Sequence, residues 1–205
     1  MLLAPLFRSG GLTVWCLNLT GRPIDENSAC VYAILLYDRP APEPPFVYIG
    51  QSRRFPARIR SHIGTARTYA RCRRRPAARP LTRRLAEVRR RTRSLLVLAL
   101  ASFETPGPEL LRCEVTWQLA AALQGLEIEA GRLCGPGARG DSEGLRGQLR
   151  EALALPWPQT WIEALAPYFR LPQQPGARVL RLSDARARSL VAASLTAPPK
   201  EPAGQ

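Results

Sequence analysis

Three apolar runs of strand length stand out along the chain. The stretch ACVYAILLYD, residues 29–38, is nearly all apolar and rich in β-branched and aromatic residues, which is typical of a buried strand. After the loop RPAPEPP, whose prolines exclude a helix or a central strand, residues 46–50 (FVYIG) predict a second strand. Residues 94–103, SLLVLALASF, predict a third. We expect the first two strands to pair as a hairpin.

Apolar residues at helical spacing predict the helices. Phe55, Ile59 and Ile63 share one face of a helix for which Ser52 is the expected N-cap and Pro56 lies in the first turn. Further helices are expected over residues 80–93, with Leu81, Leu85 and Val88 inward, and over residues 109–125, 145–155 and 159–169. One more strand is possible over residues 12–19, in a lead-in that is otherwise poorly patterned.

These elements predict an α/β (α+β) protein. We expect a small three-stranded, mostly antiparallel sheet flanked by helices, followed by a helical C-terminal extension. The expected organisation is a lead-in over residues 1–27, a folded domain over 28–130, a helical accessory region over 131–195 and a disordered tail over 196–205.

Charge changes this picture, because it is concentrated in one segment. The chain has 205 residues and a formal net charge of +14. Between Arg53 and Arg93 there are 16 arginines and a single acid, Glu87, whereas the rest of the chain is close to neutral. A general arginine bias would spread these residues along the chain. The local excess therefore predicts a phosphate-binding surface, with nucleic acid as the first expected partner.

The cysteines and the hydropathy pattern limit the other classes of function. The five cysteines are scattered with no C-x-x-C pair, so a zinc site or a disulfide framework is not expected, and a reducing cytoplasm suits them. We expect no signal peptide in the first ten residues and no membrane-spanning segment, which needs about 18 apolar residues. Membrane-surface binding is the least favoured partner class, since the basic segment lacks large apolar residues opposite its charges.

Four residue types carry candidate chemistry. The single histidine, His62, excludes a two-histidine zinc site and lies four residues after Arg58, so the two share a helix face. Glu114 is the one carboxylate among apolar helix neighbours, and burying it costs several kcal/mol unless it pairs with a cation. A salt bridge to arginine and a Mg²⁺ site are both open for Glu114. Tyr32 and Tyr48 occupy matching points of adjacent strands, where both hydroxyls can point to one end of the hairpin.

The motifs that hold these residues resemble the GIY-YIG nuclease family. CVY at 30–32 and YIG at 48–50 correspond to its paired signatures, with Cys30 and Val31 in place of Gly and Ile. Arg58 and His62 follow Gly50 by eight and twelve residues, as in many members. Glu114, followed three residues later by Trp117, corresponds to the metal-binding glutamate. The resemblance covers residues 28–130, and it departs from the family in having no asparagine after the glutamate helix.

The resemblance implies a metal-dependent endonuclease that hydrolyses DNA phosphodiester bonds with one Mg²⁺ (or Mn²⁺). Tyr32, assisted by His62, would activate water, Tyr48 would orient the reacting groups, Arg58 would neutralise the phosphate and Glu114 would hold the metal. A further set of arginines would bind the flanking DNA backbone: Arg53, Arg54, Arg60, Arg71, Arg73, Arg74, Arg75, Arg83, Arg84 and Arg90.

Two rival interpretations stay open. The first is a catalytically inactive nucleic-acid-binding module of the same fold, which the missing asparagine suggests. The second is a basic RNA-binding or ribosome-associated protein. Metal-independent, salt-sensitive binding without cleavage would select the first, and competition between RNA and DNA would test the second.

Overall fold

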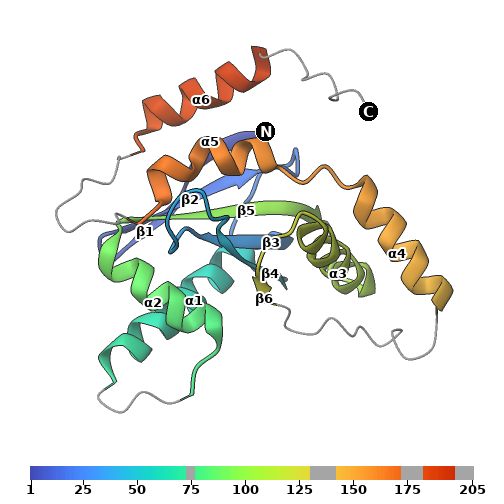
Figure 1. Ribbon diagram of the computed structural model, residues 1–205, viewed down its shortest axis with the longest axis horizontal. Coiled ribbons are helices and arrows are strands. Elements are labelled where there is room, and N and C mark those ends of the chain that lie inside the picture. Colours follow the sequence, from blue (N-terminus) through green and yellow to red (C-terminus); the bar gives the residue numbers. More distant parts are fainter. Residues whose placement is uncertain (73–76, 130–141, 172–181, 197–205) are drawn as a thin grey trace.

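A six-stranded sheet forms the centre of the protein (Figure 1). The computed structural model describes residues 1–72, 77–129, 142–171 and 182–196. The strands are β1 Leu2–Ser9, β2 Leu12–Asn18, β3 Ala29–Leu36, β4 Phe46–Ser52, β5 Ser94–Phe103 and β6 Ile128–Glu129. Their order across the sheet is β1-β2-β5-β3-β4-β6.

The prediction of a small three-stranded antiparallel sheet is wrong, although the α/β class fits. The three predicted strands are β3, β4 and β5, and they are neighbours with antiparallel pairing. The lead-in adds the antiparallel hairpin β1–β2, and β2 runs parallel to β5, so the sheet is mixed. β1 was missed because it is a half-exposed edge strand, interrupted by Pro5 and Arg8, without the apolar run that marks the central strands.

The first five helices follow the apolar spacing closely, whereas the sixth was not predicted from it. They are α1 Phe55–Arg71, α2 Pro80–Arg91, α3 Pro108–Leu123, α4 Ser142–Ala154, α5 Gln159–Phe169 and α6 Asp184–Thr196. The predicted inward residues of the first two helices are all buried. The prediction of Ser52 as N-cap is wrong: Arg54 takes that position without a side-chain cap, and the Ser52 hydroxyl accepts a hydrogen bond from the Arg54 N–H at 3.0 Å.

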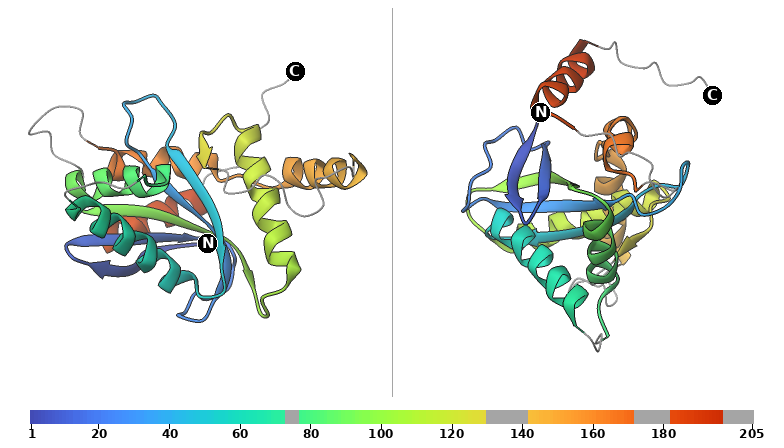
Figure 2. Two further views of the ribbon diagram at one scale, coloured as in Figure 1. Left: turned by 90° about the horizontal axis from the view of Figure 1, so that it is seen from below. Right: turned by 90° about the vertical axis from the view of Figure 1, so that its left-hand side faces the viewer.

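Helices cover both faces of the sheet (Figures 1 and 2). On one face α1 and α2 pack against side chains such as Ile34, and on the other α3 and α5 pack against alternate residues such as Leu35. This two-sided cover explains why β3 is buried along its whole length, since a strand covered on both faces is apolar at every position. The alternation also decides which residues of β3 and β4 share a face.

The accessory region is helical in the residues described, and it contacts the sheet. The Tyr37 hydroxyl, beyond the end of β3, donates a hydrogen bond to the Ile162 carbonyl of α5 at 2.8 Å. The predicted disordered tail lies outside the described residues, apart from Thr196 at the end of α6. In the described ranges no helix is long and apolar enough to cross a membrane.

Candidate active site

Two tyrosine hydroxyls meet above Gly50 in β4. Tyr32 pairs with Gly50 across the β3–β4 ladder, and Tyr48 lies two residues earlier on the same face. A Cβ atom placed on Gly50 would lie 2.9 Å from the Tyr48 hydroxyl oxygen and 3.0 Å from that of Tyr32. Because Gly50 has no side chain, both phenol groups fit into the space above it.

Helix α1 adds the imidazole and the guanidinium. His62 Nε2 lies 2.9 Å from the Tyr32 hydroxyl oxygen, and the His62 ring meets the Tyr48 ring edge-on with centroids 5.2 Å apart. The Arg58 guanidinium, one turn earlier on the same helix face, interacts with both tyrosine hydroxyls. Four of the five predicted catalytic residues therefore form one cluster.

Burial and charge set the protonation of this cluster. Burial, reinforced by the charges of Arg58 and Arg79, lowers the pKa of His62 to about 4, so the imidazole is neutral at pH 7. Burial also raises the pKa of Tyr32, and the nearby Arg58 partly opposes this rise. Burial disfavours the charge on Arg58, but its contacts with the two hydroxyls outweigh that effect and raise its pKa. A neutral imidazole thus faces a protonated phenol, which is the arrangement that lets Tyr32 donate to His62 Nε2.

A pocket of about 170 Å³ adjoins the cluster. It is lined by Tyr48, Arg58, Ser61, His62, Thr65, Arg79, Leu81, Thr82 and Glu129. Glu129 accepts a hydrogen bond from the Leu81 N–H at 2.6 Å, which satisfies one free donor at the start of α2. Sequence reasoning missed Arg79. The sequence did offer one indication: Arg79 directly precedes Pro80, which marks the start of the basic helix.

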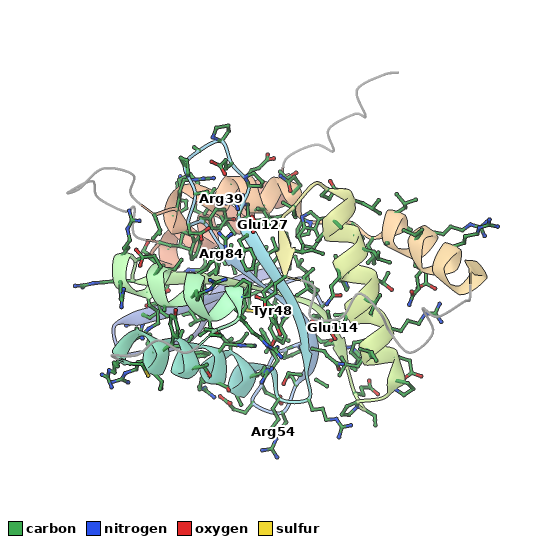
Figure 3. All side chains as sticks on the ribbon, turned by 60° about the horizontal axis from the view of Figure 1, so that its bottom comes forward. Arg39, Tyr48, Arg54, Arg84, Glu114 and Glu127 are labelled. Atoms are coloured by element: carbon green, nitrogen blue, oxygen red, sulfur yellow. The ribbon has the colours of Figure 1, made fainter. Side chains whose placement is uncertain are left out.

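Glu114 approaches β4 from the other face of the sheet. Figure 3 shows Glu114 on α3 and Tyr48 on β4, on either side of that strand. The Glu114 carboxyl group is half-buried, and burial raises its pKa while a hydrogen bond with Gln51 lowers it. In the part of the chain that the structure describes, no arginine forms an ion pair with Glu114. The salt-bridge alternative for this carboxylate therefore has no support there.

The outer edge of β4 connects the two faces. β6 pairs only with Val47 and Tyr48, so within the described residues no strand continues along the edge beside Gly50 and Gln51. Gly50 lacks a side chain and Gln51 contacts Glu114. The phenols and the carboxylate thus lie on opposite faces of the same short segment of strand.

Gln118 adds an oxygen donor beside Glu114. Its Nε2 lies 3.5 Å from a Glu114 carboxylate oxygen and 3.4 Å from the Ile49 carbonyl. Its Oε1 is buried and has no hydrogen-bond partner among the described residues, and such an atom favours a cation or a polar ligand. Carboxylate and amide oxygens suit Mg²⁺, which takes few protein ligands and keeps water and phosphate oxygens. No group of three or more His, Cys, Asp or Glu side chains that could hold a metal occurs in the described ranges.

No family model, curated protein or solved structure matches this chain. Its function therefore has to be inferred from the geometry of these residues.

The predicted DNA-binding arginines fall into four groups. Those that are exposed and form no ion pair within the described ranges are Arg53, Arg54, Arg71 and Arg83. Arg90 donates a hydrogen bond to the Ala70 carbonyl at 3.3 Å and lies 3.8 Å from Glu87. Arg73, Arg74 and Arg75 lie outside the described residues.

Arg60 and Arg84 are already paired with carboxylates. Arg60 donates two hydrogen bonds of 2.6 Å to Glu26. Arg84 bridges Asp38 at 2.7 Å and Glu127 at 2.8 Å, which ties α2 to the segments that follow β3 and precede β6. Sequence reading gave no hint of these acidic partners, because all three are distant along the chain.

Replacing Gly50 by alanine tests the shared space above β4. The added methyl group would overlap both phenols, and we expect the free energy of unfolding to fall by about 1–3 kcal/mol. Gly64→Ala in α1 is the control: a Cβ there meets nothing within 4 Å, and alanine should stabilise the helix by about 0.5–1 kcal/mol. Urea unfolding measures both. Equal stability of Gly50→Ala and the parent chain would contradict the described packing.

Proposed function

We propose that the chain is a metal-dependent endonuclease that hydrolyses DNA phosphodiester bonds by a GIY-YIG-type mechanism. The observation that carries the proposal is the 2.9 Å contact between the Tyr32 hydroxyl and His62 Nε2, with the Arg58 guanidinium close enough to interact with the same hydroxyl. The resemblance of CVY, YIG, Arg58, His62 and Glu114 to the family pattern supports the same reaction.

Proton transfer is the task of Tyr32 and His62. Water gives a proton to the Tyr32 oxygen while the Tyr32 proton moves to His62 Nε2, and the resulting hydroxide oxygen attacks phosphorus. This relay avoids a free phenolate, which the raised pKa of Tyr32 disfavours. The leaving oxygen takes up a proton from solvent.

Arg58 and Tyr48 act on the phosphate. The Arg58 guanidinium is positioned to neutralise charge that develops on the phosphate oxygens, which is the main means of stabilising such transition states. It interacts with both tyrosine hydroxyls and lines the adjoining pocket. Tyr48 orients the attacking water or a phosphate oxygen by hydrogen bonding.

The residues that would hold Mg²⁺ or Mn²⁺ are Glu114 and, through its unpaired amide oxygen, Gln118. A bound ion would supply Lewis acidity and stabilise the leaving oxygen. The half-buried Glu114 carboxylate fits this role, because a cation would offset the burial that raises its pKa.

Supercoiled plasmid DNA tests the proposed activity. The chain with Mg²⁺ should convert it to nicked or linear forms, and a chelator should stop the conversion. Duplex, flap and branched DNA of equal length would then identify the preferred structure. Intact plasmid with both Mg²⁺ and Mn²⁺, at protein concentrations that bind DNA, would refute the activity.

Arg58→Ala should lower the cleavage rate by about 10²-fold, because one fixed donor to the transition-state oxygens is lost. Arg58→Lys should recover part of that loss, since lysine keeps the charge but not the planar pair of donors. The matched control is Arg67→Ala, which removes an exposed arginine of the same helix that forms no ion pair within the described ranges. Single-turnover cleavage measures the rates. An equal loss in both alanine variants would mean that Arg58 contributes only its charge.

A second candidate is a DNA-binding module without catalysis. The observation that favours it is the position of Glu114, which lies across β4 from the phenols. This candidate predicts salt-sensitive binding that needs no metal, with no cleavage of any DNA form. A preference for RNA in competition would instead select an RNA-binding role.

A further inference from the structure

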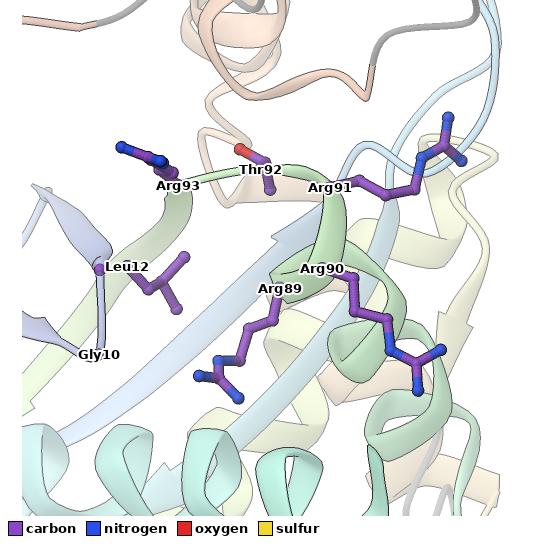
Figure 4. A pocket seen from close by; sticks show the side chains of 8 residues that line it. Gly10, Leu12, Arg89, Arg90, Arg91, Thr92 and Arg93 are labelled. Atoms are coloured by element: carbon purple, nitrogen blue, oxygen red, sulfur yellow. The ribbon is translucent and has the colours of Figure 1, made fainter. Parts of the chain in front are cut away.

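A second cationic pocket lies at the far end of α2. It has a volume of about 420 Å³ and is lined by Gly10, Gly11, Leu12, Arg89, Arg90, Arg91, Thr92 and Arg93. Figure 4 shows the arginine side chains leaving the end of α2 and the start of β5, with the β1–β2 turn across the pocket. The glycines of that turn have φ values of +55° and +81°, so the tight turn leaves this side of the pocket without side chains.

The charge of this pocket is poorly compensated. Glu87 is the acid that reaches its arginines among the described residues, at 3.8 Å from Arg90 and 3.9 Å from Arg91. Arg89 is partly buried, and its Nε atom is buried with no hydrogen-bond partner within the described ranges. The carbonyl end of α2 carries only about half a negative charge, which is too little to balance Arg89 and Arg93, neither of which forms an ion pair within the described ranges.

We infer that this pocket binds a phosphate group of the nucleic-acid backbone, at a fixed distance from the active site. An anion there would offset the burial of the Arg89 cation and accept hydrogen bonds from its guanidinium group, which lies beside Gly10. A free anion and the nucleic-acid backbone would both present a phosphate group to this pocket. We expect the backbone to supply it, because both ends of α2 are cationic and a single strand can reach both.

The length of α2 sets the spacing. The active-site pocket includes Leu81 at the start of the helix, and this pocket includes Arg90 at its end. Nine residues at 1.5 Å rise separate the two sites by roughly 14 Å. At about 3.4 Å per nucleotide of one strand, that distance corresponds to about four nucleotide steps. The spacing of about four nucleotides from the cleaved bond rests on the proposed function, whereas the binding of a phosphate in this pocket does not.

The test measures binding of a 20-base-pair DNA duplex, without metal, as a function of salt. The double variant Arg89→Ala/Arg93→Ala should bind about tenfold more weakly, and its slope of log affinity against log salt should be shallower by about one. The control Arg150→Ala/Arg188→Ala removes the same charge from exposed positions of α4 and α6 and should leave the slope unchanged. Arg93→Gln, at an exposed position, replaces the double variant if the latter unfolds.

The outcomes separate this inference from the proposed activity. A reduced slope in a chain that cleaves no DNA supports the pocket and refutes the nuclease. An unchanged slope in a chain that cleaves DNA overturns the pocket. Calorimetry with inorganic phosphate and with a nucleoside triphosphate distinguishes the sources: tight binding of either, lost in the double variant while the DNA slope is unchanged, would assign the pocket to a free anion and overturn the inference.

Discussion

Replacing Glu114 by glutamine is expected to lower the rate of DNA cleavage by at least about 10³-fold, because the site loses the carboxylate that would hold the metal ion. Glutamine keeps the size of the side chain, and the hydrogen bonds of Glu114 with Gln51 and Gln118 need only modest rearrangement. DNA affinity without metal should change by less than about threefold, since Glu114 is half-buried and is not part of the exposed arginine set. Single-turnover cleavage and fluorescence anisotropy measure the two quantities.

Glu109→Gln is the matched control for this experiment. Glu109 is an exposed carboxylate in the first turn of the same helix, α3. The substitution removes the same charge without touching β4, so the cleavage rate should stay within about twofold of the parent, as for most surface changes. Cleavage by Glu114→Gln at the parent rate would show that the mechanism is wrong.

The second large effect is expected at His62. His62→Gln should lower cleavage by about 10²–10⁴-fold, the usual contribution of a general base. In the parent chain the pKa of His62 is lowered to about 4, so the imidazole stays a competent proton acceptor well below pH 6.5. The rate should therefore fall only as the pH approaches about 4, rather than near the ordinary pKa of histidine.

The same shift gives stability a definite dependence on pH. The unfolded chain protonates His62 near its ordinary value of 6.5, and the folded chain does so only near 4. Between these values the unfolded state binds more protons, so this contribution to stability is complete above pH 6.5 and is lost as the pH falls toward 4. His62→Gln should remove that part of the pH dependence from urea unfolding curves.

Because the chain has a single histidine, its imidazole resonances need no assignment. An NMR titration should place the midpoint near pH 4, and the imidazole should be neutral at pH 6. A midpoint between 6 and 7 would show that His62 is neither buried nor close to Arg58, and would remove the proposed proton acceptor.

The part of the site that was predictable depends on local geometry. Alternation along β3 and β4 puts Tyr32 and Tyr48 on one face, and the four-residue spacing in α1 aligns Arg58 with His62. Because the strand FVYIG leads directly into α1, the tyrosine pair and the Arg58–His62 pair are expected to lie close together. These features hold whatever the rest of the sheet does.

The features that sequence could not supply depend on contacts between distant segments. β1 and β2 join the sheet through parallel pairing of β2 with β5, and about 75 residues separate these strands. The partners of Arg60 and Arg84 also lie far away along the chain, at separations of 34 to 46 residues. Gln118 looks like an ordinary polar residue until α3 packs on β4 and buries its amide oxygen. Propensity and spacing carry no information about such pairs.

We propose that a metal ion held by Glu114 and Gln118 lies close enough to His62 to serve the reaction at that cluster. Mn²⁺ tests it directly, since a bound paramagnetic ion broadens the resonances of nearby protons. We predict that Mn²⁺ broadens the His62 imidazole signals of the parent chain, and that Glu114→Gln restores them while Glu109→Gln does not. Sharp signals in the presence of Mn²⁺, or equal broadening in all three proteins, would contradict the account.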